Sequence, residues 1–303
     1  MESVLVTGGT GFIGRHLVNE LIHRGVKVAI LTSTPVSSQT TAPLAEIIYT
    51  TYDYDDLVWK LAGREYDTIY HLGWGGVSEK DKNNIPLQLK NIQVSIDMLR
   101  LSKEKKCDVF IAAGTVAEYV FNKDIIDVSL RQTPNDVYGA TKVSVHYLLE
   151  VIARQIGQDM IWAVLPSTFG EGRKGNNIIT YTITSLLKRE RPVYGNLEQM
   201  WDFLYVTEVA RALVMIGEKA RHNTTYGIGS GTYKPLKEYV CAIRDMIDPN
   251  LPLGIGEKTG QQGLISSCIN IEQLKRDTGW SPVISFEDGM KRTISYYKKC
   301  INQ

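Results

Sequence analysis

Two side chains suited to acid–base chemistry, Tyr138 and Lys142, stand four residues apart in the sequence. On a helix this spacing places the phenol and the ammonium on one face, one turn apart. A tyrosine with a pKa of about 10 exchanges protons poorly at neutral pH, but a neighbouring ammonium favours the phenolate and lowers that pKa. We therefore predict that Tyr138 transfers a proton and that Lys142 tunes its acidity.

A glycine-rich turn near the N-terminus is the first element that can position this pair. An apolar strand is expected at 3–7 and a helix at 12–24, and three spaced glycines connect them: Gly8, Gly11 and Gly14. Such glycines allow a tight turn, close backbone approach to a pyrophosphate and close contact between helix and strand. The free N–H groups at the helix N-terminus then point at the phosphates. The turn therefore predicts a dinucleotide site.

Strands and helices alternate along the rest of the chain. We expect further strands at 26–31, 47–49, 68–72, 109–113 and 160–165, and further helices at 84–105, 178–188 and 235–247. The helix at 84–105 carries apolar residues at helical spacing. With 303 residues, of which 43% are hydrophobic, the chain can hold one large α/β domain or two coupled ones.

The Thr-Gly-x-x-Gly-x-x-Gly spacing from Thr7 to Gly14 resembles the short-chain dehydrogenase/reductase superfamily. Its extended branch includes NAD(P)-dependent nucleotide-sugar epimerases, dehydratases and ketoreductases, and the segments 199–210 and 270–289 resemble further signatures of that branch. The resemblance implies an α/β fold, a doubly wound parallel sheet of Rossmann type with a smaller C-terminal α/β substrate lobe. The implied domains are 1–165 plus 200–227 for the dinucleotide and 166–199 plus 228–303 for the substrate.

The same resemblance implies roles for three catalytic residues. Thr115 occupies the Ser/Thr position of the family after the fifth strand, where its hydroxyl can donate to the developing charge on a substrate oxygen. Tyr138 moves the proton that matches a hydride passing between nicotinamide and a sugar carbon. Lys142 tunes Tyr138 and can hydrogen-bond the nicotinamide ribose. The family's dehydratases carry Asp-Glu directly after the Thr, whereas this chain has Val116 and Ala117, which disfavours dehydration.

The end of the second strand bears on which dinucleotide is bound. An acidic residue there would hold the ribose hydroxyls and repel a 2′-phosphate, but the chain has Thr32 and Ser33. Hydroxyls can donate to a phosphate, so NADP is favoured, NAD is the alternative, and Arg15 can supply a charge. The cofactor contacts that we expect are Thr7, Gly8, Gly11, Phe12, Ile13, Gly14, Thr32, Ser33, Asp53, Tyr54, Leu72, Gly73, Asn91, Ala113, Tyr138, Lys142, Pro166 and Ser167.

Substrate contacts are expected along the other side of the cleft. They are Trp74, Thr115, Val116, Ser167, Asn177 and Trp201. Trp201 stands where the family usually has an Arg that meets the nucleotide, so diphosphate recognition at this point is in doubt. The indole can stack on a base or sugar, or it can fill the core. Asp53 can equally be a solvated acid, and for Glu118 a solvated or salt-bridged role is favoured over that of a supplementary acid.

Composition excludes several other classes of function. A net charge of +1 without a basic run gives no reason to expect a nucleic-acid partner. No apolar stretch approaches the roughly 20 residues of a membrane span, and no export leader is evident, so a cytoplasmic location is expected. The cysteines and histidines are scattered without metal-type spacing, so no metal is expected. The resemblance further implies a homodimer through the helices that begin near Asn84 and Tyr138.

These observations lead to one favoured function and three others. The favoured function is an NADP(H)-dependent oxidoreductase that reduces the 4-keto group of a nucleotide-diphosphate deoxysugar. The alternative is an NAD(P)-dependent nucleotide-sugar 4-epimerase, because both reactions need only the Thr-Tyr-Lys set. A reductase of a non-nucleotide carbonyl and a non-catalytic dinucleotide-binding regulator are the remaining possibilities.

Overall fold

Parallel strands form the centre of the protein in the computed structural model, which describes residues 1–35, 44–120, 125–175, 177–258 and 267–301. Within these ranges, seven strands make one sheet in the order β3-β2-β1-β4-β5-β6-β10. Their bounds are β1 Ser3–Thr7, β2 Lys27–Thr32, β3 Glu46–Tyr49, β4 Thr68–His71, β5 Val109–Thr115, β6 Met160–Leu165 and β10 Thr224–Gly227. The strand order reverses between β1 and β4, and ligands of open α/β sheets bind at the carboxyl ends beside such a reversal.

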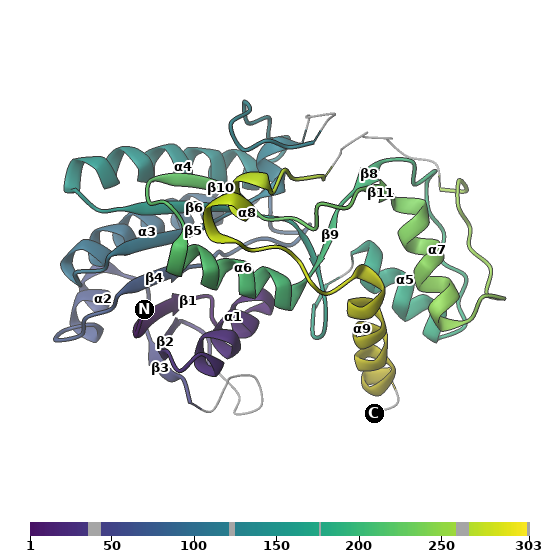
Figure 1. Cartoon of the computed structure of the whole chain (residues 1–303), viewed down its shortest axis with the longest axis horizontal. Coiled ribbons are helices and arrows are strands. Elements are labelled where there is room, and N and C mark those ends of the chain that lie inside the picture. The colour runs from purple at the N-terminus through teal and green to yellow at the C-terminus, as the bar shows by residue number, and fades with distance from the viewer. Residues whose placement is uncertain (36–43, 121–124, 176, 259–266, 302–303) are drawn as a thin grey trace.

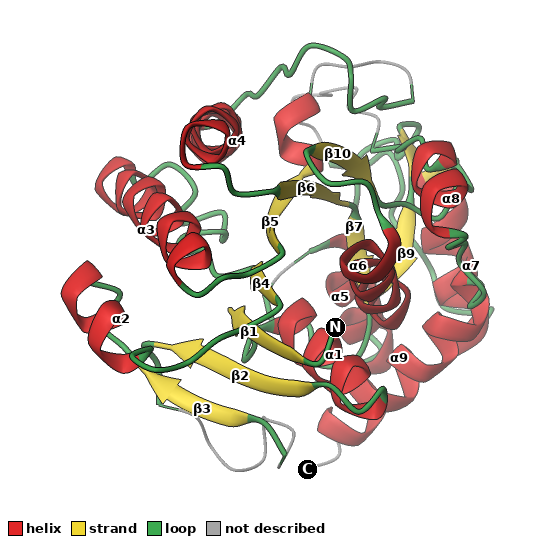
Figure 2. Cartoon of the chain, turned by 60° about the vertical axis from the view of Figure 1, so that its left-hand side comes forward, coloured by secondary structure: helices red, strands yellow, loops and turns green. Residues whose placement is uncertain are grey.

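Helices cover both faces of this sheet (Figure 2). On one face lie α1 Phe12–His23, α6 Val206–Lys219 and α8 Glu272–Thr278, and on the other lie α2 Tyr54–Lys60, α3 Ile85–Glu104 and α4 Val137–Ile156. Because successive side chains of a strand point to opposite faces, Val4 and Val6 enter one apolar core while Leu5 enters the other. The sheet is therefore doubly wound, as predicted.

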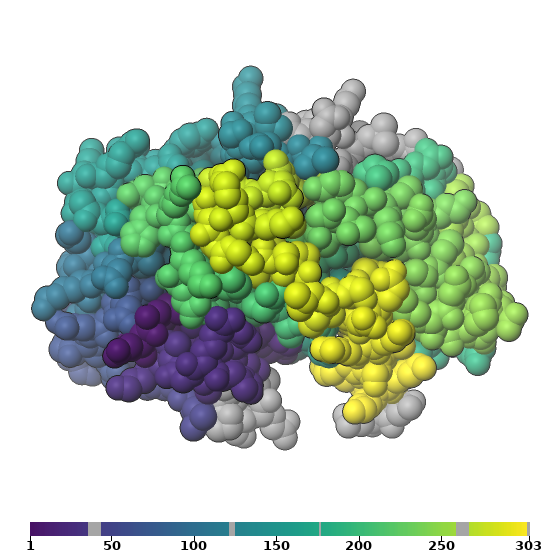
Figure 3. Space-filling view, in the orientation of Figure 1, coloured from purple at the N-terminus to yellow at the C-terminus, as the bar shows by residue number. Residues whose placement is uncertain are grey.

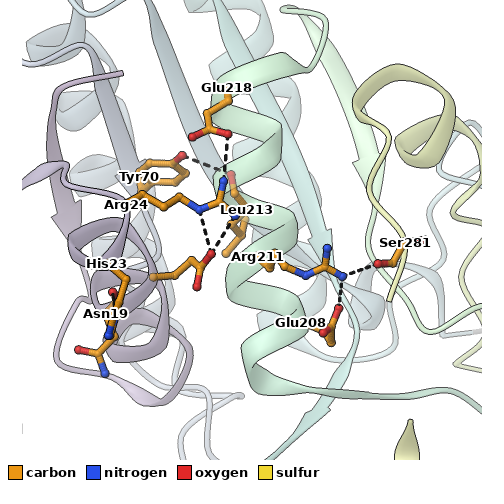
Figure 4. Close-up of polar contacts among 10 residues, drawn as sticks. Asn19, His23, Arg24, Tyr70, Glu208, Arg211, Leu213, Glu218 and Ser281 are labelled. Atoms are coloured by element: carbon orange, nitrogen blue, oxygen red, sulfur yellow. Dashed lines mark hydrogen bonds and ion pairs between the residues drawn. The ribbon is translucent and has the colours of Figure 1, made fainter. Parts of the chain in front are cut away.

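Polar side chains join the helices of the first face (Figure 4). Arg24 at the end of α1 pairs with Glu218 of α6 at 3.2 Å. Arg211 of α6 contacts Glu208 on the same helix and donates to the carbonyl of Ser281. The partly exposed Arg24–Glu218 pair contributes at most about 1 kcal/mol, so the apolar packing of α1 on α6 holds these helices together.

A second, smaller lobe lies beside the sheet and has its own apolar core (Figure 1). Its helices are α5 Ile178–Leu187, α7 Leu236–Ile247 and α9 Phe286–Ile301. Its strands are β7 Ser167–Phe169, β8 Met200–Trp201, β9 Phe203–Tyr205 and β11 Lys234–Pro235, with β7 parallel to β9 and β8 antiparallel to β11. Phe169, Phe203, Tyr239 and Phe286 pack their rings together at its centre.

The C-terminal segment spans both lobes, as its yellow surface shows (Figure 3). Leu274 of α8 and Trp280 belong to the core of the sheet, whereas α9 packs in the second lobe. Thus α8, which the expected division gives to the substrate domain, lies with the dinucleotide-binding half. The domain boundaries themselves stay a prediction. No helix was predicted at the positions of α2, α6, α8 and α9, of which α2 and α8 have only seven residues each.

Candidate active site

The glycine turn after β1 lies against the turn after β4. Gly8 has φ +70°, and a Cβ there would lie 2.7 Å from the backbone nitrogen of Gly73. A Cβ on Gly14 would overlap the carbonyl of Gly8, and Gly11 N–H donates to that carbonyl at 2.9 Å. Glycine is therefore required at both 8 and 14, for a left-handed turn and for close contact between α1 and β1.

Buried polar contacts join the ends of β1 and β4 at the strand-order reversal. The hydroxyl of Thr7 contacts His71 Nδ1 at 2.9 Å and accepts from Gly73 N–H at 3.0 Å. The other ring nitrogen of His71 contacts Ser95 on α3 at 3.0 Å. Burial lowers the pKa of His71 to about 3, with the Lys142 charge acting in the same direction. His71 is thus a neutral structural brace between β4, the Thr7 hydroxyl and Ser95.

Helix α3 holds the turn after β4 from the other side. Asn91 accepts from the Gly75 N–H and donates to the Gly75 carbonyl, both at 2.9 Å. The indole N–H of Trp74 donates to Gln88 at 2.9 Å. These contacts fix the Trp74 ring toward α4, where it meets Tyr138 edge-on with ring centroids 6.2 Å apart.

Lys142 lies beneath this ring and is 5% exposed. Its ammonium donates to the carbonyl of Ala113 at 2.7 Å and lies 3.6 Å from the centroid of Trp74. Burial lowers the pKa of Lys142, and the charge of Glu118 opposes that shift. The ammonium is therefore held at the end of β5 by one carbonyl and one aromatic face.

Tyr138 enters the site from the first turn of α4. Asp136 caps this helix by accepting from Gly139 N–H at 2.7 Å, and a Cβ on Gly139 would lie 2.6 Å from the Ala117 carbonyl. The helix therefore begins in direct contact with the segment after β5. Burial raises the pKa of Tyr138 to about 12, opposed by a hydrogen bond with Thr115.

The pKa of the Tyr138 phenol is thus above its ordinary value here, and the expected lowering by the Lys142 ammonium together with an oxidised nicotinamide stays a prediction. Lys142 is turned to the Ala113 carbonyl and to Trp74. Burial of the phenol outweighs the hydrogen bond from Thr115, while the charges of Glu118 and Asp136 add to the increase in pKa. The Tyr138 phenol is consequently a protonated donor at neutral pH.

Thr115 ends β5 and caps the single turn η1 Val116–Tyr119. Its hydroxyl accepts from Ala117 N–H at 3.3 Å, and its own N–H donates to the Glu118 carboxylate at 2.7 Å. Glu118 is fully buried and its carboxylate accepts from the Thr115 N–H and the Trp162 indole N–H, so the favoured solvated or salt-bridged role is wrong. The fold brings Thr115 and Tyr138 together as expected. The Thr-x-x-Glu pattern was a local signal for the capping contact of Glu118, whereas its burial depends on Trp162 of β6.

At the end of β2 the expected hydroxyl residues differ in exposure. Thr32 is buried and bonds to the backbone of Thr34, while Ser33 is exposed. Arg15 donates instead to the Glu171 carbonyl in the second lobe. Its charge is therefore not directed at the end of β2, where it was expected to help bind a 2′-phosphate.

The loop that carries Glu171 holds a candidate residue that the sequence did not reveal. Arg173 lies with its guanidinium 5.1 Å from the Phe12 ring, on the first turn of α1. Burial lowers the pKa of Arg173, and its charge acts on Tyr138. Gly170, Gly172 and Gly175 have positive φ and shape this loop. Their close spacing in the sequence was the signal that a tightly turned loop, and with it Arg173, could reach the site.

Other expected cofactor contacts lie around the same sheet edge. Asp53 precedes α2 and accepts from Thr51, while the Tyr54 hydroxyl donates to Glu104 of α3. Phe12, Ile13 and Leu72 are partly buried beside the glycine turn, and Pro166 follows β6. The first turn of α1 carries no acidic side chain. The turn geometry and the uncharged helix start therefore fit the phosphates of a dinucleotide.

The expected substrate residues are less uniformly placed. Trp74 and Thr115 contact Tyr138, and Val116 begins η1 and packs on the apolar core. Asn177 instead caps α5 by accepting from Ile179 and Thr180 N–H at 3.1 and 3.2 Å. Ser167 contacts Ser267 at 3.2 Å. The Trp201 indole N–H is buried without a hydrogen-bond partner among the described residues.

Metal-binding clusters and membrane-spanning helices are both missing from the described parts of the chain. These parts contain no group of three or more His, Cys, Asp or Glu side chains that could hold a metal ion. None of the helices there is both long and apolar enough to span a bilayer.

Comparisons with known proteins agree with this geometry. Residues 4–229 match the model of the NAD dependent epimerase/dehydratase family. The chain is 24% identical to dTDP-4-dehydro-6-deoxyglucose reductase of Escherichia coli, over 97% of this chain and 96% of the relative. It is 25% identical to dTDP-glucose 4,6-dehydratase of Xanthomonas campestris, over 98% and 93%. The structure of UDP-glucose 4-epimerase from Thermotoga maritima is similar, with TM-score 0.87, 22% identity and 99% of each chain covered.

Proposed function

Because the chain belongs to the NAD-dependent epimerase/dehydratase family, we propose that it is an NADP(H)-dependent oxidoreductase that reduces the 4-keto group of a nucleotide-diphosphate deoxysugar. One observation carries the proposal: Thr115 and Tyr138 meet beside the glycine turn, and apolar Val116 and Ala117 follow Thr115. Reduction needs one proton donor and one hydroxyl that holds the carbonyl oxygen, whereas elimination of water needs a further acid and base. The reductase named above is a relative with that activity.

The residues of the first lobe have the positions that such a reaction requires. The turn Gly8–Gly14, the start of α1 and the turn at Leu72–Gly73 would hold the dinucleotide, with Asn91 bracing the latter turn. When bound, the dinucleotide supplies the hydride that reaches the carbonyl carbon. Thr115 donates a hydrogen bond to the carbonyl oxygen, and Tyr138 gives that oxygen its proton. The phenolate left behind then takes a proton from solvent, and the Lys142 ammonium stabilises it until it does.

The choice of NADP over NAD rests on the end of β2. Thr32 and Ser33 put no carboxylate where one would repel a 2′-phosphate, and Ser33 is exposed there. Since Arg15 is engaged with the second lobe, the preference would come from hydroxyls and backbone N–H groups alone. Parallel binding titrations with NADPH and NADH would test it, and tighter binding of NADH would overturn this part of the proposal.

A 4-epimerase is the second candidate, because the same Thr-Tyr-Lys set serves it. An epimerase returns the hydride to the opposite face of the sugar and consumes no reduced cofactor. The decisive experiment incubates the protein with a dTDP-4-keto-6-deoxysugar and NADPH, and separately with UDP-glucose and NAD⁺. Net oxidation of NADPH with formation of the alcohol supports the reductase, and appearance of UDP-galactose without net oxidation supports the epimerase. Absence of both would overturn both, leaving a non-nucleotide carbonyl reductase or a regulator.

We further propose a homodimer through the outer faces of α3 and α4. These faces expose apolar side chains, namely Ile85, Leu89, Tyr147, Leu148 and Val151. Exposed apolar side chains gathered on neighbouring helices mark an interaction surface. Sedimentation of the protein and of a Leu89→Glu/Val151→Glu variant tests the proposal, which a monomeric parent protein would overturn.

A further inference from the structure

Glu118 is a buried carboxylate that the proposed reaction does not use. It is fully buried, and its two oxygens accept from the Thr115 N–H at 2.7 Å and from the Trp162 indole N–H at 3.3 Å. A carboxylate has no donor of its own when ionised, so two N–H donors directed at it favour the charged form. Burial nevertheless raises the pKa of Glu118.

Gly114 and Trp162 pack directly against this carboxylate. A Cβ on Gly114 would lie 2.8 Å from a Glu118 oxygen and would overlap the Trp162 indole nitrogen. The His146 ring stacks on the Trp162 ring, with the two ring centroids 4.6 Å apart, and so covers the indole. Glycine at 114 is therefore needed because the carboxylate and the indole fill the space where its side chain would be.

Lys142 lies on α4, one turn after Tyr138, and it carries the opposite charge of Glu118 into the same buried region. Its ammonium is buried, and its direct partners are the neutral Ala113 carbonyl and the faces of Trp74 and Trp162, 3.6 and 5.8 Å away. Among the residues that the structure describes, no carboxylate lies within ion-pair distance of it. A buried ammonium among neutral groups tends to lose its proton, and the Glu118 charge opposes that loss.

The remaining titratable groups around the pair keep one charge state across neutral pH. Burial lowers the pKa of His71 to about 3 and of His146 to about 4, and it raises the pKa of Tyr119. Asp136 pairs with Lys82 at 3.3 Å. Arg173 faces Tyr138 from the second lobe and stays a cation. Glu118 and Lys142 are therefore the groups here whose charge can change near neutral pH.

We propose that Glu118 is the positioning residue of this site: its carboxylate is the counter-charge that keeps the Lys142 ammonium protonated. The ammonium then holds the dinucleotide ribose and supports the Tyr138 phenolate. The inference rests on the roles proposed above for Lys142 and Tyr138. It adds a group that the Tyr-x-x-x-Lys pattern does not contain.

The test compares Glu118→Gln with Trp162→Phe. Glu118→Gln removes the charge and, because its amide NH₂ would face the Trp162 N–H, one hydrogen bond. Trp162→Phe removes the same hydrogen bond but keeps the charge. In Glu118→Gln, Lys142 deprotonates at a lower pH, so the pH at which NADPH binding weakens should fall by about one unit. The basic limb of kcat/KM should fall by the same amount. Trp162→Phe keeps the carboxylate and removes only one donor that favours its charged form, so it should move both midpoints by clearly less than Glu118→Gln does.

Two further variants keep the test decisive. Glu118→Gln/Trp162→Phe removes the clash between amide and indole N–H, so it replaces Glu118→Gln if that protein does not fold. Asp202→Asn neutralises a buried carboxylate of the other lobe, which accepts from Ser230 N–H, and should leave the midpoint unchanged. Equal midpoints in the parent protein and Glu118→Gln, or equal shifts in Glu118→Gln and Trp162→Phe, would overturn the proposal. Binding midpoints are measured without a sugar, so they stand even if no 4-keto sugar is turned over.

Discussion

The two lobes use their polar side chains differently. In the first lobe, residues far apart in sequence meet at one point: Thr7 with His71, Asn91 with Gly75, and Lys142 with the Ala113 carbonyl. In the second lobe, Asn177 caps its own helix. Asp202 accepts from the Ser230 N–H, 28 residues further along the chain. The comparison shows that Thr7, Asn91 and Lys142 bind groups at the carboxyl edge of the sheet, where the proposed chemistry lies, whereas Asn177 and Asp202 of the second lobe bind backbone N–H groups of a helix start and a loop.

Removing the phenol tests the first lobe most severely. Tyr138→Phe keeps the ring against Trp74 but removes the proton donor, so we expect kcat to fall about 1,000-fold. Dinucleotide binding, followed by quenching of protein fluorescence, should stay within about twofold. A variant with unchanged turnover would show that the meeting of Thr115 and Tyr138 is not the catalytic centre.

Removing the ring over Lys142 should have the next largest effect. Trp74→Ala takes away the aromatic face 3.6 Å from the ammonium and opens the Tyr138 side of the cleft. A buried cation–π contact of about 2 kcal/mol corresponds to a roughly 30-fold loss in kcat/KM. Trp74→Phe keeps a face and should lose less than tenfold. Equal losses in both variants would assign the effect to the lost Gln88 hydrogen bond instead.

Acid should weaken the first lobe through its buried histidines. Burial lowers the pKa of His146 to about 4, whereas the unfolded chain takes up the proton near the ordinary value of 6.5. The folded-state pKa is lowered, so the stabilisation is complete above pH 6.5 and is lost as the pH falls toward 4. At pH 5 the loss from this one group is about 2 kcal/mol. The free energy of unfolding in urea should therefore differ less between pH 7 and pH 5 in His146→Gln than in the parent protein. An equal difference in the two proteins would contradict the assignment to His146.

The smallest expected effect separates the two possible roles of Asn177. Asn177→Ala removes the helix cap and should cost about 1 kcal/mol of stability, measured by thermal unfolding. Asn177→Ser keeps a capping oxygen but loses the amide. If the second lobe uses Asn177 only as a cap, the KM for the sugar nucleotide is unchanged in Asn177→Ser. A KM raised several-fold in this stable variant would instead make Asn177 a substrate contact.

Much of the fold was predictable because its signals are local. The strands at 3–7 and 160–165 were placed correctly from apolar runs of strand length, and the helix at 12–24 ends one residue earlier, at His23. The helix at 178–188 was also predicted, and it ends one residue earlier, at Leu187. The short helix α2 was not, because its polar sequence lacks an apolar period, and its burial depends on Leu57 reaching the core between β2 and α3.

The sequence by itself determined the glycine turn, the Tyr138–Lys142 pair and the alternation of strands and helices, because spacing along one chain decides backbone conformation and which side chains share a face. Tertiary structure alone decided that Glu118 is buried against Trp162, that Arg15 reaches Glu171, and that Lys142 faces Ala113 and Trp74. Burial and charge depend on which distant segments pack together. The residues of the chemistry can therefore be read locally, whereas their protonation follows from the assembled environment.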